Sequence, residues 1–169
     1  APERFVTDSP AHLLHGMLVM RLRFTSLDAA GRHARIQWWS ATLLRRLGIG
    51  LTVHGTPRAG PTLLVANHVS WLDIIVLHAA HHCRFVSKAD VGRWPLVGRL
   101  ATGAGTLYIE RSSRRDAMRV VHDMVQALRE GDILMVFPEG TTGDGKALLP
   151  FHANLIQAAI SAPAPVQPV

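Results

Sequence analysis

The chain has 169 residues, of which 48% are hydrophobic, and its 18 lysines and arginines against 12 acidic residues give a formal charge of +6. This length suits one domain with a hydrophobic core, and the single cysteine, Cys83, excludes an internal disulfide. No run approaches the roughly 20 apolar residues that span a bilayer. A basic protein favours anionic partners, and because the arginines and aromatic residues show no nucleic-acid-binding pattern, we expect lipid and not nucleic acid.

The first fifty residues predict a tail over 1–10 and two helices over 12–24 and 28–47, the second capped near Ser26 or Asp28. Apolar residues recur along the second helix at helical spacing, while its arginines lie largely elsewhere. One interpretation is a helix docked on the protein's own core. The other is an interfacial helix with Trp38 or Trp39 at headgroup depth and arginines toward anionic lipid. The two are compatible, and the second would make residues 1–50 a membrane-associating segment.

Strands and helices alternate in the rest of the chain. The predicted strands are 51–54, 62–66, 84–87, 106–109, 133–137 and 166–169. The predicted helices are 70–80, 113–129 and 153–161, with a short helix inside the glycine-rich segment 89–105. This order predicts a single α/β domain over 51–169, with a mostly parallel sheet flanked by helices and preceded by amphipathic N-terminal helices. Because the chain stops at a predicted strand, we expect a truncated C-terminus.

A histidine follows the first buried strand of this domain, and an acid follows five residues later. His68 and Asp73 lie where the strand ends and a helix begins, which is a common place for a site in an α/β sheet. A neutral imidazole can take a proton from a hydroxyl, and a nearby carboxylate orients it and stabilises the cation that forms. The alternative is structural, because Ser70 and Asp73 also fit a capping box.

Other candidate chemistry is weaker. His78, His82 and Cys83 could form a metal site, but histidines on a helix surface are far commoner. Cys83 lacks local support as a nucleophile, and no Gly-x-Ser-x-Gly elbow is present. We therefore expect no metal and no cofactor, and a nucleophile, if the reaction needs one, must come from the substrate.

Four blocks of sequence together resemble one family. They are Asn-His-Val-Ser-Trp-Leu-Asp at 67–73, Gly-Thr-Leu-Tyr-Ile-Glu-Arg at 105–111, Phe-Pro-Glu-Gly-Thr at 137–141 and Pro-Val-Gln-Pro-Val at 165–169. In order and spacing they resemble the glycerolipid acyltransferases, whose best-known bacterial members are the 1-acylglycerol-3-phosphate acyltransferases. The resemblance covers about 51–169. It implies transfer of a fatty acyl group from acyl-ACP or acyl-CoA to the free hydroxyl of 1-acylglycerol-3-phosphate, giving phosphatidate.

The resemblance also implies roles for individual residues. His68 would be the general base and Asp73 the residue that orients it. Arg111 and the block containing Glu139, Gly140 and Thr141 would lie at the phosphate of the acyl acceptor, with Lys88 as a secondary contact. From the residues alone, we would favour a salt bridge of Arg111 with Glu110, Asp116 or Glu139 at the end of its strand, and the resemblance reverses this preference.

One departure concerns the acceptor. Many family members carry arginine directly after Phe-Pro-Glu-Gly-Thr, whereas this chain has Thr142, and Lys146 is the nearest basic substitute. A lyso-ornithine lipid would fit a weaker phosphate site, so lyso-ornithine lipid O-acyltransferase is one alternative function. A non-catalytic lipid-binding module is another. The expected location is the cytoplasmic face of the inner membrane, peripheral or anchored, with a lysophospholipid and the membrane surface as partners.

Overall fold

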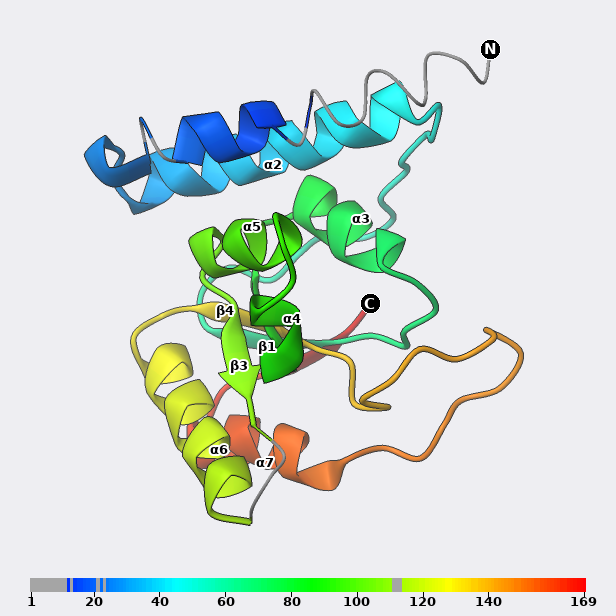
Figure 1. Ribbon diagram of the computed structural model, residues 1–169. Coiled ribbons are helices and arrows are strands. Elements are labelled where there is room, and N and C mark those ends of the chain that lie inside the picture. The colour runs from blue at the N-terminus through cyan, green and yellow to red at the C-terminus, as the bar shows by residue number, and fades with distance from the viewer. Residues whose placement is uncertain (1–11, 13, 21, 23, 111–113) are drawn as a thin grey trace.

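The computed structural model describes residues 12, 14–20, 22, 24–110 and 114–169 (Figure 1). The predicted tail at 1–10 and the predicted phosphate ligand Arg111 therefore lie outside the described residues.

The described strands form one five-stranded sheet with the order β3-β2-β4-β1-β5. All four neighbouring pairs run parallel. The strands are β1 (Thr62–Val65), β2 (Arg84–Lys88), β3 (Leu107–Ile109), β4 (Ile133–Val136) and β5 (Val166–Pro168). Since β1 and β4 are neighbours, the segments that follow them emerge side by side at the carboxyl edge of the sheet.

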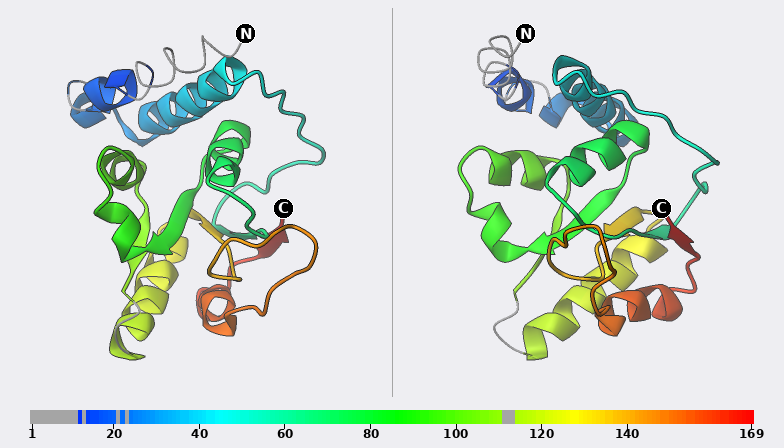
Figure 2. Two further views of the ribbon diagram at one scale, coloured as in Figure 1. Left: turned by 45° about the vertical axis from the view of Figure 1, so that its right-hand side comes forward. Right: turned by 90° about the vertical axis from the view of Figure 1, so that its right-hand side faces the viewer.

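Helices cover both faces of the sheet. They are η1 (Phe24–Ser26), α2 (Ala29–Arg46), α3 (Leu72–Ala80), α4 (Ala89–Gly92), α5 (Val97–Gly103), α6 (Arg114–Arg129) and α7 (Ala153–Ser161). Figures 1 and 2 show α6 and α7 on one face and α3 and α5 on the other. The helical residues 14–20 and α2 form a further layer across the top of α3 and α5. We call residues 14–46 the N-terminal hairpin.

Alternation along the strands divides the core between the two faces. On β1, Leu63 packs with α6 and α7, whereas Leu64 packs on the side of α3. On β4, Leu134 and Met135 divide in the same way. Successive side chains of a strand point to opposite faces, so both faces of these apolar strands are covered, as expected for a parallel sheet. The expected α/β fold is confirmed.

Two local predictions differ from the structure. Residues 51–54, predicted as a strand, are irregular and belong to the long connection from α2 to β1. Thr52 and Val53 are β-branched, but Leu51 and Val53 are exposed and none of the described strands pairs with this segment, so local propensity alone does not form a strand there. The segment 89–105 holds two helices, α4 and α5, where one short helix was predicted.

Side chains of α2 and of its cap form hydrogen bonds within the N-terminal region and to α3. The Asp28 carboxylate caps α2 by accepting a hydrogen bond from the Gly31 amide at 2.8 Å, as predicted. Trp39 Nε1 donates to the carbonyl of His12 at 3.1 Å. Gln37 Nε2 donates to the carbonyls of Ala79 and Ala80 at 3.2 Å, which occupies the carboxyl end of α3. No helix among the described residues is long and apolar enough to cross a bilayer.

We expect Gly98→Ala to destabilise the fold by about 1–3 kcal/mol, because the new methyl group would overpack α5 against α4. A Cβ atom at Gly98 would lie 2.3 Å from the carbonyl oxygen of Gly92, which is backbone and cannot move aside. Gly50→Ala is the matched control, since nothing lies within 4 Å of its added Cβ atom. Urea unfolding of both variants is the measurement, and equal stabilities would contradict the proposed close packing.

Candidate active site

The loop after β1 and the first turn of α3 bring His68 and Asp73 into contact. His68 Nδ1 lies 2.8 Å from Asp73 Oδ2. An ionised carboxylate only accepts hydrogen bonds, so Nδ1 carries the hydrogen and Nε2 is the nitrogen available to accept a proton. The His68 side chain is 16% exposed, which leaves it partly accessible to a substrate.

Asp73 also organises the loop that carries His68. Its Oδ2 atom accepts hydrogen bonds from the amides of Val69 at 2.7 Å and Ser70 at 2.9 Å. Burial raises the pKa of Asp73, but the hydrogen bonds from these amides and from His68 outweigh burial and lower the pKa below its ordinary value. Ser70 Oγ accepts from the Leu72 amide at 3.1 Å. The two interpretations of Asp73 are therefore compatible, because one carboxylate accepts hydrogen bonds both from the loop amides and from the imidazole.

Phe137, directly after β4, packs against one face of the His68 imidazole. The two rings stack with centroids 4.0 Å apart and an interplanar angle of 11°. Phe137 is itself buried and packs in the core on the α3 side of the sheet. The plane of the His68 ring is thus fixed by a core residue and its in-plane orientation by Asp73.

Glu139 joins the loops that follow β1 and β4. Only 5% of the residue is exposed, and its two oxygens accept hydrogen bonds from the amides of His68 at 3.2 Å and Leu149 at 3.0 Å. The Gly143 amide donates in turn to the carbonyl of His68 at 2.7 Å. The amide and the carbonyl of His68 are therefore both hydrogen-bonded to the segment 139–149. A direct contact of Glu139 with a glycerol hydroxyl remains a prediction, whereas the structure gives it a positioning role.

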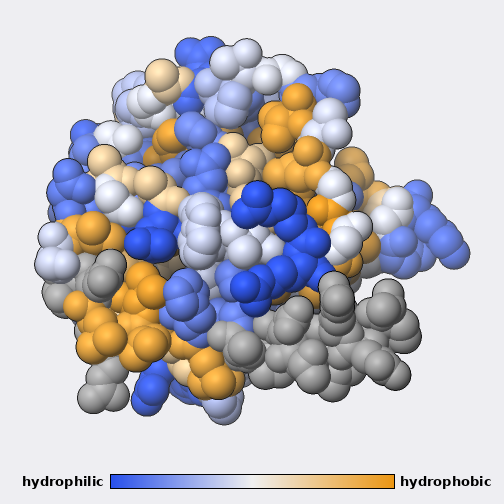
Figure 3. Space-filling model, turned by 90° about the horizontal axis from the view of Figure 1, so that it is seen from above, coloured by the Kyte–Doolittle hydropathy of each residue, from blue (hydrophilic) through white to orange (hydrophobic). Residues whose placement is uncertain are grey.

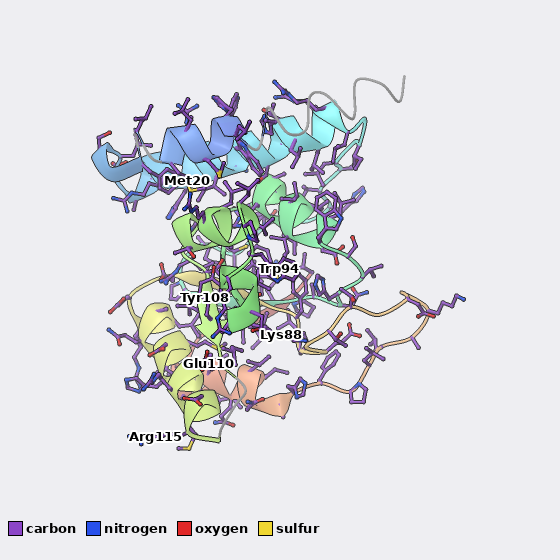
Figure 4. The ribbon with its side chains drawn as sticks, viewed as in Figure 1. Met20, Lys88, Trp94, Tyr108, Glu110 and Arg115 are labelled. Carbon is purple, nitrogen blue, oxygen red and sulfur yellow. The ribbon has the colours of Figure 1, made fainter. Side chains whose placement is uncertain are left out.

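The other described residues that were predicted to bind substrate are Lys88, Gly140 and Thr141. Lys88 is exposed at the carboxyl end of β2, next to β4, and Figure 4 shows it on the side of α4. Gly140 is half-buried with a φ angle of 66°, and Thr141 is exposed. Beyond the end of β3, Glu110 pairs with Arg93 at 3.0 Å. The roles of these residues in binding stay predictions.

Backbone amides near His68 are largely engaged. Those of His68, Val69, Ser70 and Gly140 all donate within the protein. Within the described part of the chain, the amides of Thr141 and Thr142 have no such acceptor. They are therefore better candidates to stabilise an oxyanion than the loop that carries His68.

The structure also contains an apolar cavity of about 400 Å³, which neither His68 nor Asp73 lines. It lies between the N-terminal hairpin, α3 and the segment that contains α4 and α5. Trp71, directly before α3, and Ile74 and Ile75 on α3 line it. Met20 reaches it from the hairpin and Trp94 from the loop before α5 (Figure 4). The sequence gives no sign of this cavity, because its wall combines residues from segments that carry no common motif.

His78 on α3 is buried, and His82, which follows α3, is stacked on another ring. Burial lowers the pKa of His78 to about 4, and burial together with neighbouring cationic groups lowers the pKa of His82 to about 3. The His82 ring stacks on His33 of α2 with centroids 3.2 Å apart, and burial raises the pKa of the Cys83 thiol to about 12. Among the described residues, no cluster of three or more potential ligands could hold a metal ion.

We expect stability to fall as the pH drops from 7 toward 4, in part because of His78. Its folded-state pKa of about 4 lies below the ordinary 6.5, so in this range the unfolded chain binds a proton that the folded chain excludes. One such histidine contributes at most about 1.4 kcal/mol per pH unit. Urea unfolding at pH 7 and pH 5 should show a smaller pH-induced loss for His78→Leu than for the unchanged protein. Equal losses would argue against a proton-excluding environment.

A family model described as Acyltransferase matches residues 50–169. The chain therefore belongs to the Acyltransferase family, as its resemblance to the glycerolipid acyltransferases predicted. The crystal structure of the 1-acyl-sn-glycerophosphate acyltransferase PlsC from Thermotoga maritima matches with a TM-score of 0.71 and 19% identity, over 96% of this chain and 73% of that one. This likeness confirms the fold.

Two kinds of curated relative are similar to the chain at nearly equal identity. Lyso-ornithine lipid O-acyltransferase of Pseudomonas aeruginosa is 42% identical over 151 residues, which are 89% of this chain and 58% of that protein. 1-Acyl-sn-glycerol-3-phosphate acyltransferase of Neisseria meningitidis is 40% identical over 126 residues, which are 73% of this chain and 49% of that protein. The chain thus spans about half the length of these relatives, and they do not distinguish the two acceptors.

Proposed function

We propose that this protein transfers a fatty acyl group from acyl-ACP or acyl-CoA to the hydroxyl of 1-acylglycerol-3-phosphate, giving phosphatidate. The observation that carries the proposal is the contact between His68 and Asp73. An apolar cavity lined by Trp71, Ile74 and Ile75, which are close to Asp73 in the sequence, supports it. An alcohol is a poor nucleophile until it loses its proton, and a thioester supplies an acyl group with a good leaving group. The site needs no nucleophile of its own, because the substrate brings one.

The reaction follows from the arrangement of the two side chains. His68 Nε2 takes the hydroxyl proton while the oxygen forms a bond to the thioester carbonyl carbon. Asp73 stabilises the imidazolium through Nδ1. When the tetrahedral intermediate collapses, the carbon–sulfur bond breaks and the imidazolium returns the proton to the sulfur. The products are an ester and a free thiol, and His68 regains its starting state.

The cavity supports a fatty acyl group as the transferred unit. Its lining residues are mostly apolar. Burying a hydrocarbon chain there would contribute a favourable free energy of about 25 cal/mol per Å² of apolar surface removed from water. A volume of about 400 Å³ lies within the range of small-molecule sites in proteins. Because Trp71, Ile74 and Ile75 are close to Asp73 in the sequence, we propose that a chain bound in the cavity directs its carboxyl end toward His68.

A second acceptor is supported by a specific observation. Thr142 stands where many family members have arginine after Phe-Pro-Glu-Gly-Thr, and relatives named for lyso-ornithine lipid match as well as those named for 1-acyl-sn-glycerol-3-phosphate. A lyso-ornithine lipid presents a hydroxyl for the same chemistry without a phosphate monoester.

The deciding experiment measures thiol release from acyl-ACP and acyl-CoA with each acceptor supplied separately. Phosphatidate formation from lysophosphatidate supports the main proposal, and preferential acylation of lyso-ornithine lipid supports the second candidate. Binding of vesicles without turnover of any acceptor would support a lipid-binding module and contradict both.

We also propose that the protein works at the cytoplasmic face of the inner membrane with its N-terminal hairpin toward the lipid. Leu14, Leu18 and Leu22 recur every fourth residue, and each is more than half exposed. Figure 3 views the molecule from the side of this hairpin and shows hydrophobic and hydrophilic residues side by side. Exposed leucines in a basic setting are typical of an interfacial helix.

A further inference from the structure

A groove at the N-terminal hairpin combines leucines with a cation. Leu18, Leu22 and Val19 line it from the first helix, together with His15, and Arg35 lines it from α2. Arg35 lies over the ring of Trp38, with its guanidinium carbon 5.4 Å from the ring centroid. The groove thus has an apolar floor and a guanidinium held beside an aromatic ring.

The charge of the hairpin makes this groove suitable for an anionic amphiphile. Residues 12–46 contain six arginines and a single acid, Asp28. Asp28 is engaged at the start of α2, where it caps the helix. Among the described residues, Arg35 has no carboxylate partner within ion-pair distance. A guanidinium binds phosphate oxygens in a fork, and an adjacent apolar floor accepts hydrocarbon.

The groove and the internal cavity share part of their walls. His15, Val19 and Arg35 line both. A molecule in the groove would therefore lie against the residues that enclose the cavity. This position distinguishes the groove from a general basic surface, because its occupant would contact defined side chains.

We propose that this groove binds one anionic phospholipid of the membrane, with its phosphate at Arg35 and an acyl chain along Leu18 and Leu22. The proposal rests on the membrane-facing orientation proposed above and adds a lipid class and a place to it. The site is separate from the acyl-transfer chemistry at His68, so it can be tested without measuring turnover.

The experiment compares binding of the full chain to vesicles of phosphatidylcholine alone and of phosphatidylcholine with phosphatidylglycerol. The unchanged protein should prefer the anionic vesicles, and Arg35→Gln should lose this preference. Arg45→Gln is the matched control, since it removes the same charge from the same helix at a side chain that bonds Thr42 and lines neither space. Diffuse attraction to a membrane is worth about fivefold for either arginine. A specific site predicts that the loss for Arg35→Gln exceeds that for Arg45→Gln by tenfold or more.

The apolar part of the site has its own variant. Leu18→Asn should weaken binding to both kinds of vesicle, whereas Val53→Asn, at a similarly exposed position outside the hairpin, should not. Monomeric dihexanoyl phosphatidylglycerol should bind the unchanged protein saturably, one molecule per chain, and should not bind Arg35→Gln.

The outcomes separate the site from its premises. Equal losses for Arg35→Gln and Arg45→Gln, or no saturable binding of the short-chain lipid, would overturn the site while leaving the membrane orientation intact. Failure of the unchanged protein to bind any vesicle would overturn the orientation and the site together. Neither result depends on acyl transfer, which the acceptor panel tests separately.

Discussion

His68→Ala is expected to lower acyl transfer by about 10²–10⁴-fold, which is the usual contribution of a general base. The variant keeps the cavity but has no group to accept the hydroxyl proton. Thiol release from an acyl thioester in the presence of lysophosphatidate measures the effect. His54→Ala is the matched control, because His54 is exposed in the connection between α2 and β1, away from the contacts that hold His68. Full activity of a folded His68→Ala variant would contradict the proposed chemistry.

Asp73→Asn extends this test, since its carboxylate orients the imidazole and accepts two loop amides. The amide side chain would leave Nδ1 without an anionic partner and would remove support for the imidazolium. We therefore expect a loss of similar size in kcat, even with saturating substrate. A change confined to KM would instead indicate that Asp73 acts only through the shape of the loop.

Glu139→Gln is expected to lower both activity and stability. Each Glu139 oxygen accepts a backbone amide, so in the variant one amide would face a side-chain NH₂ group and lose its acceptor. Leaving a buried donor unsatisfied costs about 1–3 kcal/mol. The His68 backbone would lose one of its restraints, and the imidazole would spend less time in the reactive position. Urea unfolding and the thiol-release assay measure the two effects.

Glu130→Gln supplies the control for this buried carboxylate. Glu130 is exposed near the end of α6 and accepts a hydrogen bond only from the Gln126 side chain one turn earlier. Its replacement should change stability by no more than about 0.5 kcal/mol. If Glu139→Gln behaved like Glu130→Gln, the two loops would have to be held together by other contacts, and the positioning role of Glu139 would be refuted.

The elements of the sheet could be predicted from the sequence because local patterns determine them. Apolar runs such as those of β1 and β4 are buried on both faces, and the acid at Asp28 marked the start of α2. The contact between His68 and Asp73 could also be predicted, since both residues lie on one short segment between a strand and a helix. The strand at 51–54 was wrong because a sequence pattern does not say whether a neighbouring strand is available to pair with it.

The remaining features of the site depend on contacts between residues that are far apart in the sequence. Glu139 lies 71 positions from His68, and its hydrogen bond to that amide depends on β1 and β4 being adjacent. A motif could indicate that Glu139 matters, but not that it would be buried with two backbone partners. The cavity likewise depends on how the N-terminal hairpin docks on α3 through Gln37, which is a tertiary contact without a local signal.

The division of the molecule into a sheet edge and a superposed hairpin has an evolutionary consequence. His68 and Glu139 belong to the loops that follow β1 and β4, whereas much of the wall of the apolar cavity comes from the hairpin and α5. Under the proposed function, substitutions in the cavity wall would reshape the space offered to a fatty chain without disturbing His68 and Asp73. A lineage could therefore diversify its lipid preferences step by step while retaining an unchanged reaction.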